Sequence, residues 1–519
     1  MNMLMKNNVE RWELVKGNTT NNKKSPSAQP LFQSLDENLN DIRTTLGNSS
    51  DLVTRPFSIH KTSAAVLYMD GLVDKNTVQN FILESLMLEV PEKRHFTHHL
   101  YESIKEANLP IGEMSEVEDK QDLLKKLLSG ETILLLDKQT KALSASTKGW
   151  RDRGVQETTS ESVIRGPKEA FTETIRTNTA LLRRKIKDPN LRVEAKTIGR
   201  KTCTDIAVVY LEGTAEKEVL DQVKERLNQI DIDAVLESGY IEEFIQDAQY
   251  SPFPTVYNSE KPDAIAGGIL EGRVAILIDG TPNVLLVPAL FVNFMQSSED
   301  YYQRADIGTL VRLLRLFCFS VALFMPSLYI AFTTFHQEMI PPPLLISLAS
   351  QREGVPFPAF VEALMMELTF EVLREAGVRL PKPVGSAVSI VGALVLGQSA
   401  VQAGLVSPAM VIVVAITAIS SFVFPAYNMA ISIRILRFPL MILAATFGLF
   451  GIILGMIAMV FHLCSLQSFG KPYMAPLAPM IGKDQKDVLI RLPHWGLLSR
   501  PSFFTKNDQK RVDSKSKER

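Results

Sequence analysis

Three long runs without a formal charge dominate the second half of the chain and limit what it can fold into. They lie between Arg315 and Glu338, from Pro383 to Ile433, and from Phe438 to Gly470. An α-helix needs about 20 apolar residues to cross the hydrocarbon core of a bilayer, and the middle run is long enough for two such helices. The runs therefore predict a helical membrane region with spans near 312–335, 385–403, 407–425 and 438–464.

The segment between the first two predicted spans favours a different kind of helix. Apolar residues recur every four positions from Phe360 to Val372, which predicts an amphipathic helix over 358–376 with acids on another face: Glu367, Glu371 and Glu375. Because carboxylates are costly in lipid, we expect this helix to lie at the interface, to re-enter the membrane or to be lined by protein. If exposed, the acids form a vestibule that concentrates cations at one mouth of a pore. The alternative is pairing with Arg374 and Arg379 on the same helix.

The predicted span 385–403 carries small residues at four-residue spacing, followed by two polar ones. The small residues are Gly385, Ser389, Ala393 and Gly397, and the polar ones are Gln398 and Gln402. Such a stripe permits close contact between helices in a membrane. One interpretation is that this helix lines a pore, where its polar groups replace water around an ion. The other is that it packs against a neighbouring span of its own chain.

The flanks of the membrane region decide the expected topology. Four spans place both chain ends in the cytoplasm, which suits the basic C-terminal tail, but they place Arg434 and Arg437 outside, against the positive-inside tendency. A fifth span would reverse both placements, and we favour four. The N-terminus has no apolar segment typical of a secretory signal. Residues 1–50, rich in Asn, Ser, Thr and Lys, predict a disordered tail.

An internal repeat organises the first half of the chain. "AAVLYMDGLVDKNTV" at Ala64 resembles "IAVVYLEGTAEKEVL" at Ile206, and "LSGETILLLDKQT" at Leu128 resembles "LEGRVAILIDGTP" at Leu270. The offset is the same in both matches, which predicts an internal duplication. Each copy reads as strands alternating with helices. We therefore expect two similar α/β cytosolic subdomains, 51–150 and 151–300 with its linker, then a transmembrane domain over 301–470 and a cytosolic tail over 471–519.

The turn that ends the second copy has its own chemistry. In "DGTPN", Asp279 begins the turn, Gly280 permits a positive φ, and Pro282 fixes its own φ. A hairpin at this point, close to the first span, can attach the folded domain to the membrane region without a flexible linker.

Local motifs for catalysis and cofactor binding are missing from the sequence. Neither a GxGxxG nor a GxxxxGK[ST] phosphate-binding loop occurs, and the three cysteines are far apart. "HFTHH" (His95, His98 and His99) can place two imidazoles on one helical face, but without further ligands it favours a structural histidine cluster. A net charge of −1 argues against nucleic acid as a partner. We expect no enzyme, no metal and no cofactor.

Several long segments carry a resemblance to a known family. They are "RGPKEAF" (165–171), "SPFPTVYNSEKPDAIAGGILEGRVAILIDGTPNVLLVPALFVNFMQSSEDYYQR" (251–304), "FHQEMIP" (335–341), "REGVPFPAFVEALMMELTFEVLREAG" (352–377), "VSIVGALVLGQSAV" (388–401) and "VSPAMVIVVAITAISSF" (406–422). Over roughly residues 50–500 the chain resembles the A subunit of GerA-type spore germinant receptors.

The resemblance implies a multi-pass protein of the spore inner membrane with its large N-terminal domain on the cytoplasmic or core side. It implies a transporter-like B subunit and a lipoprotein C subunit as partners. It also implies assembly with copies of itself, as a ring of five, into a nutrient-gated ion channel that triggers germination. Two alternatives remain: a related stage V sporulation protein that accompanies the dipicolinic-acid channel, and a transporter with a cytosolic regulatory domain.

Overall fold

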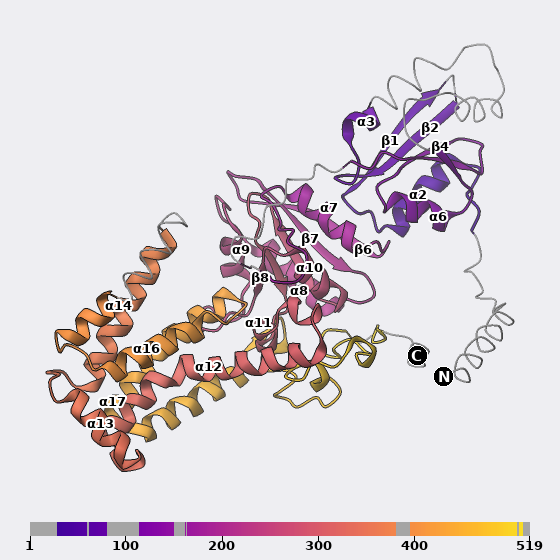
Figure 1. The fold of residues 1–519 in the computed structure, drawn as a ribbon. Coiled ribbons are helices and arrows are strands. Elements are labelled where there is room, and N and C mark those ends of the chain that lie inside the picture. Colours follow the sequence, from indigo (N-terminus) through magenta and orange to yellow (C-terminus); the bar gives the residue numbers. More distant parts are fainter. Residues whose placement is uncertain are drawn as a thin grey trace, which may run out of the picture. The chain divides into compact units, whose positions relative to one another are not determined.

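The computed structural model describes residues 29–59, 62–79, 114–149, 161, 163–379, 395–505 and 508–511. The chain divides into two compact units, residues 1–151 with 187–189, and residues 152–186 with 190–519. The first unit contains one sheet with its helices. The second contains another sheet, a helical region and a C-terminal segment (Figure 1).

The sheet of the first unit has five strands in the order β1-β2-β4-β5-β3, and all their pairings are antiparallel. Its elements are α2 (Leu35–Thr45), β1 (Leu52–Ile59), β2 (Thr62–Met69), α3 (Lys75–Gln79), β3 (Met114–Val117), α6 (Lys120–Leu127), β4 (Thr132–Leu136) and β5 (Ala142–Ala145). The central strands β2 and β4 are almost entirely apolar and buried, as their sequences "TSAAVLYM" and "TILLL" require.

Helix α2 lies inside the stretch predicted to be a disordered tail, so that prediction is wrong for this part of residues 1–50. Leu35, Leu39 and Ile42 occupy one face at helical spacing and are buried. The Ser34 hydroxyl caps the helix by accepting a hydrogen bond from the backbone N–H of Glu37 at 3.4 Å. Three buried apolar side chains within the helix, with a cap and the buried Leu31 and Leu46 beside it, order a segment whose average composition is polar. Residues 1–28 lie outside the described part of the chain.

The sheet of the second unit has the order β6-β7-β9-β10-β8, again with antiparallel pairings. Its elements are α7 (Ile175–Lys185), β6 (Leu191–Ile198), β7 (Thr204–Leu211), α8 (Lys217–Gln229), α9 (Ser238–Ile245), β8 (Tyr257–Ser259), α10 (Pro262–Leu270), β9 (Val274–Ile278) and β10 (Val284–Val287). Helices cover both faces. Ile206, Val208 and Tyr210 of β7 contact the core under α8 and α9, while the alternate residues face α7 and α10.

The two sheets match element by element. Strands β2, β4 and β5 correspond to β7, β9 and β10 at the single offset expected from the repeat, so Tyr68 and Tyr210 occupy equivalent positions. The first strands, β1 and β6, correspond at a smaller offset. The difference arises at the hairpin, where Ile59 pairs with Thr62 in one sheet and Ile198 pairs with Thr204 in the other. The second turn is therefore longer than the first.

The helical region follows β10 through α11 (Phe291–Met295) and a short 3-10 helix, η2 (Ser298–Tyr301). Its helices are α12 (Ala305–Thr334), η3 (Gln337–Met339), α13 (Pro342–Arg352), α14 (Ala359–Arg379), α16 (Pro408–Ser421) and α17 (Tyr427–Ser465), and residues 395–402 are also helical. Within the described residues, α12 and α17 are long and apolar enough to cross a membrane, and α16 is apolar but shorter. The predicted count of four spans is not confirmed. Most of the predicted span 385–403 lies outside the described residues.

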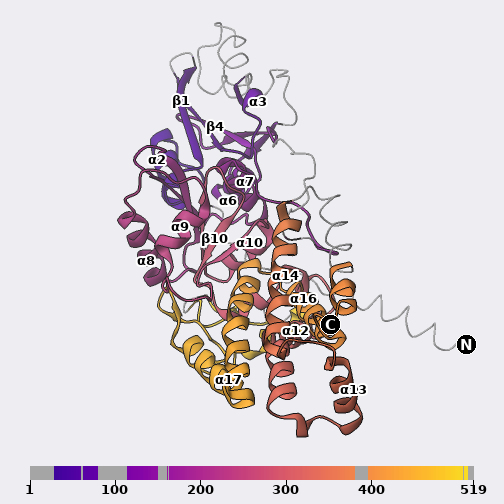
Figure 2. The same ribbon diagram turned by 90° about the vertical axis from the view of Figure 1, so that its left-hand side faces the viewer.

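Helix α17 contains the largest departure from the predicted spans. Gly448 has φ 60° and ψ −140°, which breaks the helix into a first arm (427–447) and a second arm (449–465). A Cβ on Gly455 would lie 2.6 Å from a methyl carbon of Leu440, so the two arms run back to back (Figure 2). The span predicted near 438–464 is therefore divided between two antiparallel arms and is not one continuous helix. Gly448 allows the reversal and Gly455 allows close contact between the arms.

The C-terminal segment after α17 folds back onto the second sheet. It contains β11 (Gln467–Ser468), β12 (Lys471–Pro472), η4 (Gln485–Asp487) and η5 (His494–Gly496). Phe469 is buried in the core under α8 and α9, and the Lys471 ammonium lies 2.5 Å from the Glu216 carboxylate. Much of the described part of the predicted tail 471–519 is thus folded against neighbouring elements, and its cytosolic location stays a prediction. The helical region begins and ends at the same sheet.

Candidate charge site in the helical region

The predicted acidic face of α14 is mostly paired with α17. Glu367 is completely buried and forms an ion pair with Arg437. Glu371 lies 3.1 Å from Arg434, and of the three acids only Glu375 is exposed. Glu367 therefore does not belong to an exposed vestibule. The alternative of pairing within α14 holds for Glu375, whose carboxylate lies 2.6 Å from Arg379.

A further acid on α14, Glu362, extends the site to the other end of the helix. It is completely buried, 3.3 Å from Arg352. Its carboxylate accepts hydrogen bonds from the backbone N–H and the hydroxyl of Ser407, at 3.0 and 2.9 Å, and Ser407 also contacts the Tyr329 hydroxyl of α12. Glu362 is a site residue that sequence reasoning missed. Its signal was a carboxylate on a helix flanked by apolar runs.

The charges along α14 form a ladder between helices. Its described members are Glu362, Glu367 and Glu371 with Arg352, Arg434 and Arg437. At 1.5 Å per residue, Glu362 and Glu371 are about 13.5 Å apart along α14. Removing one partner of a buried pair costs about 3–5 kcal/mol because the other charge is left uncompensated. The pairs of Glu367 and Glu371 therefore hold α14 against the first arm of α17, and the pair of Glu362 holds it against α13.

The ladder has unused hydrogen-bonding capacity. Buried atoms without a hydrogen-bond partner within the described structure include Oε1 of Glu362, Glu367 and Glu371, and Nε of Arg434 and Arg437. Next to them, the Arg374 guanidinium stacks on the rings of Phe422 and Tyr427, at 5.2 and 6.0 Å from their centroids. Buried polar groups usually satisfy their hydrogen bonds.

Only one residue of the predicted stripe of small residues belongs to the part of the chain that the structure describes. Gly385, Ser389 and Ala393 lie outside the described residues. Gly397 is buried, and a Cβ at this position would lie 3.5 Å from a methyl of Val411 on α16. This contact belongs to the same chain, as the packing interpretation expects. Gln398 and Gln402 of this helical stretch are exposed.

The turn Asp279–Pro282 has a structural role. The Asp279 carboxylate accepts a hydrogen bond from the backbone N–H of Ile175, the first residue of α7, at 2.9 Å. Gly280 has φ 93° and donates its N–H to the Glu173 carbonyl at 2.7 Å, while Pro282 is half-buried. The turn joins β9 to β10 and caps α7, so it fixes the fold of the second sheet.

A second group of buried charges marks the beginning of α12. The Asp300 carboxylate accepts hydrogen bonds from Arg312 and Arg315, at 3.2 and 2.7 Å. Arg312 also contacts Asp487 of the C-terminal segment at 2.9 Å. Burial raises the pKa of Asp487, and the neighbouring guanidinium opposes this shift. These contacts connect the first turns of α12 to the C-terminal segment.

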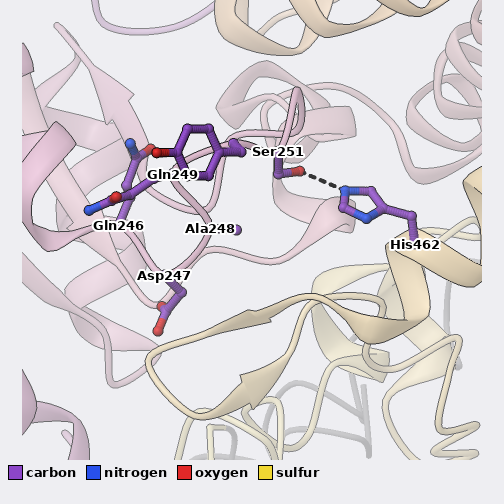
Figure 3. A pocket seen from close by; sticks show the side chains of 7 residues that line it. Gln246, Asp247, Ala248, Gln249, Ser251 and His462 are labelled. Carbon is purple, nitrogen blue, oxygen red and sulfur yellow. Dashed lines mark hydrogen bonds between the residues drawn. The ribbon is translucent and has the colours of Figure 1, made fainter.

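A shallow hollow lies where the second arm of α17 reaches the sheet domain. It is lined by Gln246, Asp247, Ala248, Gln249, Tyr250, Ser251 and His462. The Ser251 hydroxyl and Nε2 of His462 are 2.9 Å apart, and Figure 3 shows this contact bridging the loop and the helix. The described residues contain no cluster of three or more His, Cys, Asp or Glu suited to a metal. His95, His98 and His99 fall outside them.

Comparison with known proteins identifies relatives along most of the chain. A family described as "Bacillus/Clostridium GerA spore germination protein" matches residues 40–503. The chain is 50% identical over 484 residues to "Spore germination protein KA" of Bacillus subtilis (strain 168), covering 93% of this chain and 88% of that protein. It is 44% identical over 497 residues to "Uncharacterized membrane protein YfkQ" of the same organism, covering 94% and 96%.

A solved structure is similar to about half of the chain. It is titled "Crystal structure of the N-terminal domain of the A subunit of the Bacillus megaterium spore germinant receptor GerK3". The two chains are 41% identical, with 51% of this chain and 98% of that chain covered, and the TM-score is 0.43.

Proposed function

The chain belongs to the GerA family of spore germination proteins, and from this premise we propose that it is the A subunit of a nutrient germinant receptor. In this proposal it lies in the spore inner membrane, with its sheet domains on the core side, beside a transporter-like B subunit and a lipoprotein C subunit. Copies of the chain assemble, as a ring of five, into an ion channel that opens when nutrient is sensed.

The similarity to "Spore germination protein KA" carries the assignment to germination, because it extends through both sheets and the helical region. It also favours a receptor subunit over a stage V protein or a transporter. The matching order of the two sheets supports an internal duplication as their origin.

The buried Glu367–Arg437 pair supports the channel part of the proposal. Ionisable residues inside membrane helices are costly and are typical of ion pathways and of the elements that open them. Here the pair joins α14 to the first arm of α17. A shift of α14 has to separate these charges or exchange their partners. We therefore assign the ladder to gating and the exposed Gln398 and Gln402 to the lining of the pore.

Deletion of the gene tests the receptor assignment. Spores without it are expected to lose germination on at least one nutrient and to regain it when the wild-type gene is restored. Germination on every nutrient at the wild-type rate, in a strain without a second receptor of the same specificity, would contradict the proposal.

A paired substitution tests the role of the ladder. Glu367→Leu with Arg437→Leu replaces both charges by apolar side chains, a change that buried pairs often tolerate. We expect normal protein levels but altered nutrient-triggered cation release. Glu375→Leu with Arg379→Leu is the matched control, because it removes an exposed pair from the same helix. Unchanged release from the buried-pair variant would refute the gating role.

The same release assay tests the pore lining. Gln398→Leu with Gln402→Leu should change the rate or ion preference of release, while Gln351→Leu on the exposed α13 should not. Normal release at normal protein level would remove this helical stretch from the pore.

A further inference from the structure

We propose that the loop Gln246–Ser251 and the exposed face of α9 rest on the near leaflet of the bilayer, giving the sheet domain a second kind of membrane contact besides its covalent connections to α12 and α17. This inference rests on the proposed function, because it takes the helical region to be in a membrane. Near leaflet here means the leaflet on the side of the sheet domain.

The far end of the helical region is defined by three residues. A Cβ on Gly448, at the tip of the α17 hairpin, would lie 3.0 Å from the Cβ of Phe335 and 2.7 Å from the ring of His336. These two residues directly follow α12. The tip of the hairpin and the end of α12 are therefore at the same level.

The distance of the loop Gln246–Ser251 from the tip of the α17 hairpin follows from contacts with both arms of the hairpin. The Ser432 hydroxyl in the first arm donates to the carbonyl of Pro252 at 2.5 Å, and His462 in the second arm contacts Ser251 at 2.9 Å. Ser432 and His462 are each about four helical turns from Gly448, on opposite sides of it. The loop thus lies about 21–24 Å from the tip, measured along the helices.

This distance is shorter than the thickness of the lipid core. A typical hydrocarbon core is about 30 Å thick. Along α12, Arg315 is about 30 Å from Phe335, and it is the last charged residue before the uncharged run. With Phe335 at the far boundary, Arg315 lies at the near boundary. The loop is then at the depth of the near boundary or slightly inside it.

The side chains around the loop suit this depth. Tyr250 is 99% exposed, and Leu236, Tyr240 and Phe244 are exposed in and before α9. Tyrosine is enriched where membrane meets water because its ring is apolar and its hydroxyl is polar. Figure 1 shows α9 on the side of the second sheet from which the helices extend.

Of the acids near the contact, Glu243 of α9 is exposed, while the others form hydrogen bonds or ion pairs within the sheet domain or are largely buried. Asp247 is paired with Arg226 at 2.6 Å and accepts the N–H of Phe469, and Glu237 accepts hydrogen bonds from Gly239 and Thr281. Burial raises the pKa of Glu242 to about 7. Aromatic side chains therefore dominate the contact, and we expect it to be independent of anionic lipid.

The test places probes on the full-length protein. In a variant with Cys203, Cys318 and Cys464 changed to serine, Tyr250→Cys, Phe244→Cys or Ile164→Cys is labelled with an environment-sensitive fluorophore. Ile164 is the matched control because it is 95% exposed and lies just before Gly166, which packs against Tyr302. Tyr302 precedes α12, so it lies on the side of Arg315 that faces away from the lipid core. The protein is reconstituted into phosphatidylcholine vesicles, with and without phosphatidylglycerol and with nitroxide-labelled lipid.

The proposal expects blue-shifted emission and strong quenching by nitroxide lipid at position 250, weaker quenching at 244, and neither effect at 164. Quenching at 250 no greater than at 164 overturns it. So does a probe at 250 that is shielded from water but not quenched by lipid, because that result assigns the face to a second copy or another subunit. Alkaline carbonate extraction separates the two hypotheses: release of the whole protein from vesicles contradicts the membrane assignment itself, whereas retention with a water-exposed probe contradicts only the second contact.

Discussion

The two five-stranded sheets have the same strand order and differ in what completes them. The second sheet takes Phe469 from beyond the helical region into its core, and Ser468 donates to the Thr255 carbonyl and accepts the N–H of Ala289. Within the described residues of the first unit, the core is built from its own strands and helices. The shared strand pattern thus accounts for the topology of both sheets. The second sheet is connected to the helical region by Ser468 and Phe469, which do not belong to that pattern.

Phe469→Ala should have the largest effect on the difference between the sheets. Loss of a fully buried phenylalanine costs about 3–5 kcal/mol. Arg226 also stacks on this ring, 4.2 Å from its centroid. We expect faster hydrogen exchange in peptides from β7 and β9 and unchanged exchange in β2 and β4. Phe244→Ala, at an exposed position of the same unit, is the control.

An equal increase in hydrogen exchange in both sheets of Phe469→Ala would contradict the expected difference between them, because it would mean that the two units unfold together. No change in either sheet would remove the C-terminal segment from the core of the second one.

The sequence contained enough information to predict the two sheets and their equivalence. The apolar strands around Tyr68 and Tyr210 and the shared offset of the repeat are local signals, and the strands form where they predict. Helix α2 was missed because it contains only three buried apolar side chains, Leu35, Leu39 and Ile42, in a polar stretch. The position of Phe469 was beyond sequence reasoning because its partners in the core belong to strands and helices on the other side of the helical region.

The candidate site was harder to predict for the same reason. The acids of α14 were identified, but their partners Arg434 and Arg437 lie much later in the chain and were interpreted as topology signals. The hairpin in α17 depends on the single backbone conformation of Gly448, and the sequence there is apolar on both sides. Hydrophobic periodicity does not distinguish a reversed pair of short helices from one long helix.

The second unit should also show a pH dependence that originates in α9. Burial raises the pKa of Glu242 to about 7 from 4.5, while Asn258 opposes the shift and Glu237 adds to it. A raised folded-state pKa means that the folded state holds the proton more tightly. Stability is then greatest below about pH 4.5 for this group and decreases as pH rises towards 7.

Glu242→Gln removes this contribution. The difference between a folded-state pKa of about 7 and the ordinary value of 4.5 corresponds to at most about 3–4 kcal/mol between the two ends of the window. Thermal unfolding of the detergent-solubilised chain between about pH 5 and 8 should therefore be less pH-dependent in the variant. An unchanged slope would show that Glu242 is ionised throughout this range in the folded protein.

Two equivalent glycines allow a direct comparison of the sheets. Gly130 and Gly272 have φ +86° and +101°, and a Cβ at each would lie 2.8 or 2.9 Å from the carbonyl of an equivalent residue, Leu72 or Thr214. Alanine at either position should cost about 1–3 kcal/mol because of the strained backbone. Gly272→Ala should cost more, because its Cβ would also meet the Phe504 carbonyl at 3.0 Å.

Local hydrogen exchange in peptides from β4 and β9 measures the two glycine effects within one protein. A smaller loss of stability for Gly272→Ala than for Gly130→Ala would contradict the expected clash between the new Cβ at 272 and the Phe504 carbonyl of the C-terminal segment.

The smallest expected effect is at the two helix caps, where the sheets should behave alike. The Asp137 carboxylate accepts the N–H of Leu35 at 3.2 Å, and the Asp279 carboxylate accepts that of Ile175 at 2.9 Å. Each acid also places a negative charge at the N-terminus of a helix, where it is favourable. Asp137→Ala and Asp279→Ala should each cost about 0.5–2 kcal/mol.

Because each carboxylate accepts the N–H of the first residue of its helix, the two losses, measured from exchange in α2 and α7, should agree within about 0.5 kcal/mol. Asp→Asn at both sites, which keeps an acceptor, should recover most of each loss. A loss of stability for Asp279→Ala several times larger than for Asp137→Ala would mean that this turn also helps to attach the second sheet to the helical region.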